Sequence, residues 1–252
     1  MTKQLCCLLW MLVFTMQLQA QKIAGDTLPF KKVLLIPYDP HYYLSDADRD
    51  IAEQTNQDPQ SIRKMFRSET DRCVYRAIKQ KQTCISLMED SSASLYNDAV
   101  QLLSHTGFAY DIPTIKEKRN IKDRLHLNAE SNVQVDSRVA SQYINDDASK
   151  KYMKAVLNKP EMLNAMAGKY DFDVFVFVTQ FEIKTNYASC LDIANKIYKR
   201  EVLLHFTIYD RYGNLVAGNF SKSFFPSDNN NANKIIGECF PQLAEGLVDS
   251  FE

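Results

Sequence analysis

The pattern of apolar and polar positions predicts strands that alternate with helices. Short apolar runs at residues 31–38 and 83–88 are typical of buried strands. Residues 172–183 give the strongest signal, because both alternating faces are apolar over the first half of the run. That pattern indicates a central strand covered on both sides. Residues 200–225 form two alternating runs around a polar turn, which predicts a β-hairpin.

Apolar residues recur at helical spacing between and after these strands. Ser45 is expected to cap a helix that opens with Asp46, Asp48 and Asp50, and Asp58-Pro59 is expected to start a second helix. Further helices are predicted at residues 95–103, ended near Gly107 by a glycine cap, at 137–156, at 158–168, closed by Gly168, and at 235–248.

This order of elements predicts an α/β or α+β fold. We expect a mixed sheet of about four to five strands flanked by helices, with the carboxyl-terminal hairpin followed by a closing helix. Residues 114–136 are charged and weakly periodic, so they predict an exposed excursion. Residues 21–252 are therefore expected to form one domain with an exposed insertion around residues 110–157.

Residues 1–20, MTKQLCCLLWMLVFTMQLQA, have the order of a secretory signal peptide. A positive charge at Lys3 precedes an apolar run from Leu5 to Leu18, and small Ala20 stands before polar residues. A membrane anchor is the alternative, but a helix of this length spans about 21 Å, short of the ~30 Å hydrocarbon core. Leu18 is larger than the residue usual three positions before a cut. We expect cleavage after Ala20 and a periplasmic or secreted location.

The remaining composition excludes some classes of partner. The formal net charge is −1 and 24% of the residues are charged, which gives no electrostatic basis for binding nucleic acid. No later stretch approaches 18 apolar residues, so no transmembrane anchor is expected once the signal is removed.

Four of the six cysteines lie beyond the signal: Cys73, Cys84, Cys190 and Cys239. In an exported protein they could form two disulfides, with three possible pairings. The alternative is buried free thiols, because cysteine packs as a small apolar residue. The chain has no C-x-x-C, so zinc-ribbon and thioredoxin chemistry have no motif.

Three segments resemble the small envelope domain of several exported bacterial proteins: KKVLLIPY at 31–38, YDFDVFVFVTQFEI at 170–183 and EVLLHFTIYDRYGNLVAGNFSKSF at 201–224. The group includes the TolB amino-terminal domain, the periplasmic domain of the curli secretion channel and the penicillin-binding-protein activator lipoproteins. Here Tyr212-Gly213 replaces the usual Thr-Gly of the hairpin turn, and residues 110–157 have no counterpart. The resemblance implies a non-enzymatic interaction module.

Metal binding has little support in the sequence. The triplet Asp46, Asp48 and Asp50 is similar to the start of a calcium loop, but Ile51 and Gln57 stand where that loop needs glycine and glutamate. We expect these acids to complement a helix amino terminus instead. His41 beside Asp39 does not define a coordination geometry, so no metal or cofactor ligand is assigned.

Catalytic chemistry has only weak candidates, and no G-x-S-x-G or H-E-x-x-H motif occurs. Cys190 and His205 form the one Cys–His combination of note in the carboxyl-terminal half, and His205 is expected to line a groove or contact solvent. Asp171 and Asp173 would share one face of a strand, as paired carboxylates for acid–base work do, or be ordinary exposed acids.

The sequence therefore favours an exported, non-enzymatic envelope protein that acts as a protein-interaction module; its partner would be an envelope protein of unknown identity. The candidate anchors are Tyr209, Tyr212 and Phe220 on the outer side of the hairpin, because aromatic residues dominate interface hot spots. Residues 114–124 carry a net positive charge and could contact an anionic partner or be a solvated loop. No catalytic residue is assigned. An exported hydrolase with an unrecognised active site is the alternative.

Export predicts a defined amino terminus for the protein isolated from its native location. Sequencing should begin at Gln21, and the protein should lack tryptophan fluorescence, because Trp10 is the only tryptophan of the chain. Intact Trp10 in the folded, localised protein would contradict the signal-peptide prediction.

Overall fold

A computed structural model describes residues 32–113 and 151–251. The helices are α2 (Asp48–Thr55), α3 (Pro59–Lys79), α4 (Ala93–Ser104), α7 (Glu161–Tyr170) and α8 (Ala232–Val248), with short 3-10 turns at Pro40–Tyr42 and Asp249–Phe251. The strands are β1 (Lys32–Ile36), β2 (Tyr43–Ser45), β3 (Thr83–Ser86), β4 (Thr106–Asp111), β5 (Tyr152–Leu157), β6 (Val174–Asp192), β7 (Ile197–Asp210) and β8 (Leu215–Pro226). The predicted mixed α/β fold is confirmed.

The main sheet has six strands, with the order β3-β1-β6-β7-β8 and β2 paired to β6. β1 runs parallel to both β3 and β6, whereas β6, β7 and β8 form an antiparallel meander. β1 and β2 follow each other along the same edge of β6, because Val33 lies opposite Val174 and Tyr43 lies opposite Phe181. The long β6 strand is therefore the centre of the sheet.

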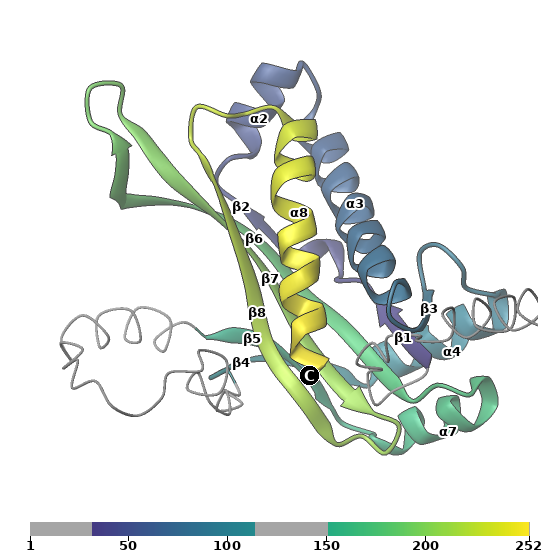
Figure 1. The fold of residues 1–252 in the computed structure, drawn as a ribbon. Coiled ribbons are helices and arrows are strands. Elements are labelled where there is room, and N and C mark those ends of the chain that lie inside the picture. The colour runs from purple at the N-terminus through teal and green to yellow at the C-terminus, as the bar shows by residue number, and fades with distance from the viewer. Residues whose placement is uncertain (1–31, 114–150, 252) are drawn as a thin grey trace, which may run out of the picture.

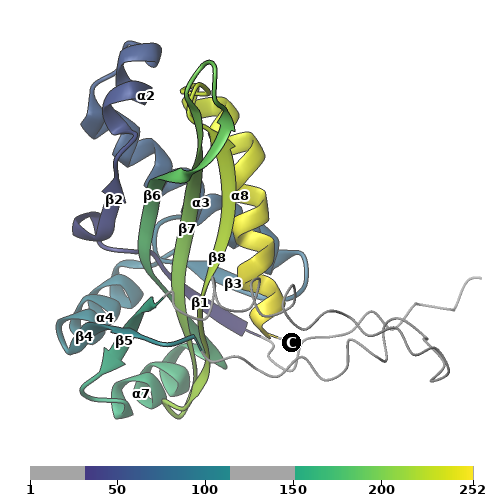
Figure 2. The same ribbon diagram turned by 90° about the vertical axis from the view of Figure 1, so that its left-hand side faces the viewer.

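Helices cover both faces of this sheet (Figures 1 and 2). On one face, α3 and α8 pack on alternate strand residues such as Val176 and Val202. On the other face, α4 and α7 pack on Phe175 and Phe177. Phe175 and Val176 are both fully buried, which confirms the prediction that residues 172–183 include a strand with two covered faces.

The antiparallel pair β4–β5 completes the second face, and β5 docks there through four hydrogen bonds from its backbone to side chains of the sheet. The Met153 N–H donates to His205 Nδ1 at 2.9 Å, and its carbonyl accepts from Thr179 Oγ1 at 2.5 Å. The Ala155 N–H donates to Thr207 Oγ1 at 3.0 Å. The Ala155 carbonyl accepts from the Tyr209 hydroxyl at 2.5 Å. These bonds occupy the edge of β5 that faces away from β4.

The close approach of β5 also depends on a glycine. The Tyr152 side chain is fully buried against Gly218 of β8. A Cβ atom at position 218 would lie 1.9 Å from the Tyr152 hydroxyl oxygen. Only glycine leaves room for the ring at this point.

Several predicted boundaries are wrong. The helix expected through residue 156 is, where the structure describes it, the strand β5, because tertiary hydrogen bonds override the helical spacing of Tyr152 and Val156. The α4 helix ends at His105 rather than at a glycine cap, since Gly107 belongs to β4. The α7 helix continues past Gly168 to Tyr170.

Of the two helix starts predicted near Ser45 and Asp58, only the second is confirmed. Ala47 rather than Ser45 stands at the start of α2, whereas the predicted start of α3 at Asp58-Pro59 is confirmed, with Asp58 accepting a hydrogen bond from the Ser61 N–H.

None of the helices within residues 32–113 and 151–251 is both long enough and apolar enough to cross a membrane. The predictions for residues 1–20 and 114–136 fall outside the described residues.

A charge in either buried face should unfold the domain. Phe175→Asp or Val176→Asp would place an unpaired carboxylate in an apolar layer, at a cost of several kcal/mol, which is comparable with the whole stability of a typical domain. Urea denaturation followed by far-UV circular dichroism would measure the effect, with Tyr212→Asp, at an exposed turn position, as the control. Wild-type stability in both core variants would contradict the burial of this strand.

Candidate interaction site

The hairpin of β6 and β7 extends beyond the other strands of the sheet (Figure 1). β2 pairs with β6 only as far as Ile183, and β8 pairs with β7 only from Lys199 onward. Residues 186–197, here called the arm, are therefore a two-stranded ribbon whose outer edges pair with no other strand of the described chain. Two register shifts, on either side of Cys190, interrupt its ladder.

The arm carries three strongly exposed apolar side chains. Tyr187 is 72% exposed, Leu191 51% and Ile193 85%. The Tyr187 ring packs edge-on against Tyr198, with 5.2 Å between the ring centroids, so it is held in place although it faces solvent. Exposed aromatic and aliphatic side chains gathered on one element are typical of a protein-interaction surface.

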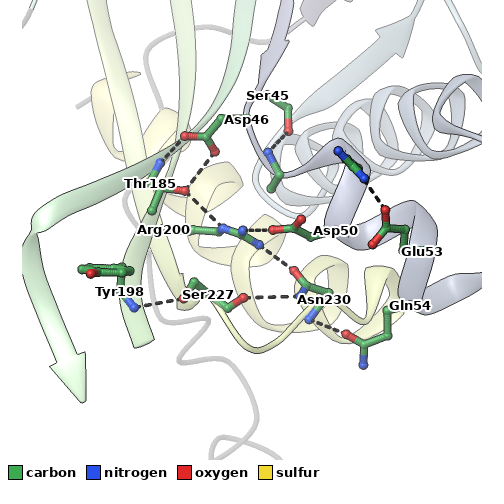
Figure 3. A network of polar contacts seen from close by, with 12 residues as sticks. Ser45, Asp46, Asp50, Glu53, Gln54, Thr185, Tyr198, Arg200, Ser227 and Asn230 are labelled. Atoms are coloured by element: carbon green, nitrogen blue, oxygen red, sulfur yellow. Dashed lines mark hydrogen bonds and ion pairs between the residues drawn. The ribbon is translucent and has the colours of Figure 1, made fainter. Parts of the chain in front are cut away.

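The base of the arm is fixed by the buried guanidinium of Arg200 (Figure 3). Its Nη2 pairs with Asp50 of α2, and its Nη1 donates to Asn230 Oδ1 at 2.6 Å. Its Nε donates to Thr185 Oγ1 at 3.2 Å. Because all three nitrogens have acceptors, the desolvation cost of burying this charge is offset, and β6, β7, α2 and the segment before α8 are tied together.

Further bonds hold each strand of the arm at this level. On β6, Asp46 accepts from the Thr185 N–H at 2.7 Å and from its hydroxyl at 3.1 Å. On β7, the Tyr198 N–H donates to Ser227 Oγ at 2.9 Å, and the Ser227 N–H donates to the Tyr198 carbonyl at 2.8 Å. The arm is thus anchored on both strands where it leaves the sheet.

Of the acid triplet near Ser45, Asp48 and Asp50 lie in the first turn of α2, as expected, whereas Asp46 precedes the helix. Asp46 binds Thr185 and Asp50 pairs with Arg200, while Asp48 accepts from the Tyr43 hydroxyl at 2.7 Å and pairs with Arg63 at 2.8 Å. The three carboxylates are therefore engaged with separate partners. Within the described ranges, no group of three or more His, Cys, Asp or Glu side chains could hold a metal ion.

The structure does not bring Cys190 and His205 together. Cys190 lies on the exposed arm opposite Tyr198, and His205 lies seven residues further along β7. At about 3.3 Å per strand residue the two are roughly 23 Å apart, so they cannot form a nucleophile–base pair.

His205 is a structural residue. The expectation that it lines a groove or contacts solvent is wrong. It is only 2% exposed, because β5 covers it, and its Nδ1 accepts the Met153 N–H, which places the ring proton on Nε2. Burial, with a smaller effect of the Lys184 charge, lowers its pKa to about 3. Nε2 lies 3.6 Å from Glu182 Oε1 in the same buried region.

The acidic pair Asp171 and Asp173 is also structural. Asp171 ends α7 in the left-handed conformation, with φ 61°. Asp173 Oδ2 accepts the Lys32 N–H at 3.1 Å, and its other oxygen lies 3.8 Å from Arg211. The two acids do not share a face of a strand, since β6 begins only at Val174.

The four cysteines are free thiols, with no disulfide among them. Cys84 and Cys239 are buried and Cys73 is half-buried, and burial raises the pKa of each of these thiols. Cys190 is exposed, and its Sγ lies 3.5 Å from the Ile197 carbonyl across the arm. None of the buried thiols is therefore poised as a nucleophile.

Of the three predicted anchors, only Tyr212 faces solvent, with 68% of its surface exposed. Tyr209 is buried, because its ring packs on Phe177 and its hydroxyl holds β5, so the prediction that it is a surface anchor is wrong. Phe220 is half-buried beside the His205 ring. The sequence analysis does not identify Tyr187, Leu191 and Ile193 as surface residues. The signal that could have done so is their position among polar residues just after the continuous apolar run at residues 172–183 ends.

Comparisons of the chain with known protein families, with curated proteins and with solved structures find no match. The basic residues 114–124 lie outside the described residues.

His205 should make the protein less stable in acid. Its pKa is about 3 when folded and about 6.5 when unfolded, so between these values only the unfolded chain binds the proton, and stability falls as the pH falls. His205→Asn keeps an acceptor near Nδ1 but does not titrate. Between pH 6.5 and pH 4.5 the wild type should lose about 2 kcal/mol more than the variant.

Urea denaturation of both proteins across this pH range would measure the difference. Burial raises the pKa of Asp71 to about 6, which has the opposite effect on acid stability, but this carboxyl is present in both proteins and cancels. Parallel curves for the two proteins would contradict the buried, neutral state of His205.

Proposed function

We propose that this protein is an exported, non-enzymatic envelope protein that binds a partner protein of the envelope through the arm. The observation that carries the proposal is the display of Tyr187, Leu191 and Ile193 in solvent on a two-stranded ribbon with unpaired edges. An extended segment of the partner can add to such an edge by main-chain hydrogen bonds, and the apolar side chains supply the anchors.

The anchored base of the arm also favours binding. Arg200 and Asp46 fix both strands before the partner arrives, so less conformational entropy is lost on association than for a loose loop. The packing of Tyr187 on Tyr198 extends this order into the arm itself.

The alternative, an exported hydrolase, finds no support in the residues considered for it. His205 is buried with its Nδ1 occupied, Asp171 ends a helix, and Asp173 bonds Lys32. Cys190 lies on the arm, far along β7 from His205. An active site requires several polar groups gathered in one pocket, and these four groups are dispersed.

Cross-linking in the native envelope would test the proposal. A photoreactive amino acid in place of Ile193 should capture one defined partner, and the same residue in place of Tyr212, which is exposed at the far end of the sheet, is the matched control. Leu191→Asp should reduce partner capture and complementation of a deletion strain at least tenfold, because a charge replaces an apolar anchor.

The melting temperature of Leu191→Asp should stay at the wild-type value, since the residue contacts solvent and single surface changes alter stability by less than about 0.5 kcal/mol. Equal capture at positions 193 and 212, or full complementation by Leu191→Asp, would contradict a role for the arm.

A further inference from the structure

A second candidate site lies at the carboxyl ends of the parallel neighbours β1 and β3. After β1 the chain leads to α3 on one face of the sheet, and after β3 it leads to α4 on the other. Adjacent parallel strands whose connections go to opposite faces leave a crevice beyond their carboxyl ends, where ligands of α/β proteins bind. A cavity of about 960 Å³ occupies this position, lined by Ile36 and Pro37 after β1 and by Leu87 and Met88 after β3.

One wall of the cavity is apolar and comes from α4. Tyr96, Val100 and Leu103 lie three and four residues apart and line the cavity together, so they form one row along the helix. Tyr96 and Val100 are exposed, whereas Leu95, about 100° around the helix from Tyr96, is buried against the sheet. Thus α4 has a second apolar face, which runs for about 10 Å from Tyr96 to Leu103.

The opposite wall holds the charged groups. The Asp39 carboxylate is engaged, because it accepts from the His41 N–H at 2.8 Å and lies 2.6 Å from His41 Nδ1. The guanidinium of Arg67 reaches from α3 and donates through Nε to the Tyr38 carbonyl at 2.8 Å. None of the described residues forms a hydrogen bond with its two Nη atoms, although the Arg67 charge also acts on the carboxylates of Asp39 and Asp71, so these donors are open to a ligand.

We propose that this cavity binds a single-chain carboxylate amphiphile, such as a fatty acid. The planar guanidinium of Arg67 matches a carboxylate by paired hydrogen bonds, and the row on α4 provides a continuous apolar surface for the chain. The volume lies within the range of small-ligand pockets, and Arg67, with the Asp39 carboxylate engaged by His41, supplies one cationic group for a ligand with one charged end. The proposal does not depend on the function proposed for the arm.

Methyl-labelled methionine and nuclear magnetic resonance provide the test on the purified protein. Dodecanoate, added below its micelle-forming concentration, should shift the Met88 methyl resonance until it saturates, because Met88 lines the cavity. The Met65 resonance should not move, since Met65 packs on the other face of the sheet and serves as the internal control.

Two comparisons isolate the role of Arg67. Dodecanol has the same chain without the charge and should bind at least tenfold more weakly than dodecanoate. Arg67→Gln should weaken dodecanoate at least tenfold and leave dodecanol unchanged. Val100→Glu places a charge on the apolar wall at an exposed position, so the helix should stay folded and binding of both dodecanoate and dodecanol should be lost. This second variant tests the cavity independently if Arg67→Gln fails to fold.

A Met88 resonance that dodecanoate does not move would overturn the proposal, as would equal affinity for dodecanol and dodecanoate. Tighter binding of acetyl-trileucine, a peptide carboxylate, than of dodecanoate would also overturn it, and would assign the cavity to a peptide terminus instead.

Discussion

The second layer of this protein depends on β5 being able to lie across the face of a sheet. The backbone groups along its outer edge need partners once they are buried, and the backbone of the main sheet is already committed to its own ladders. Side chains supply the partners instead: His205, Thr207 and Tyr209 come from alternate positions of β7, and Thr179 from β6. Polar residues in the middle of two central strands are therefore a requirement of the fold, and one of them, His205, is the residue that had been considered for catalysis.

The sequence predicts the elements whose signals are local. β1, the buried half of β6, the β7–β8 hairpin and the closing helix have apolar periodicities that only one kind of element satisfies. The sequence does not predict β4, and it predicts a helix where β5 lies, because Tyr152 and Val156 have helical spacing and short strands of mixed polarity carry no distinct pattern. Their strand conformation comes from hydrogen bonds to residues about 50 positions away, such as Met153 to His205.

The same limit explains what could be predicted of the candidate sites. Alternation along β7 gives the face on which His205 and Tyr209 lie, but it cannot show that another strand covers that face. Local sequence patterns cannot predict the cavity beyond β1 and β3 either. Its lining residues come together only because α3 and α4 pack on opposite faces of the main sheet. In contrast, the departure of the acid triplet from a calcium loop can be read locally, because two residues of that loop are missing, and the structure adds the partner of each acid.

The register shifts beside Cys190 have a consequence for self-association. A flat ribbon with two open edges would pair with copies of itself and grow into aggregates. Register shifts of this kind twist a ribbon and displace its hydrogen-bonding groups from the regular spacing, so a regular strand finds few of them in line. The irregular ladder thus disfavours regular edge-to-edge pairing, and the arm can keep apolar side chains in water without offering a regular template for strand addition.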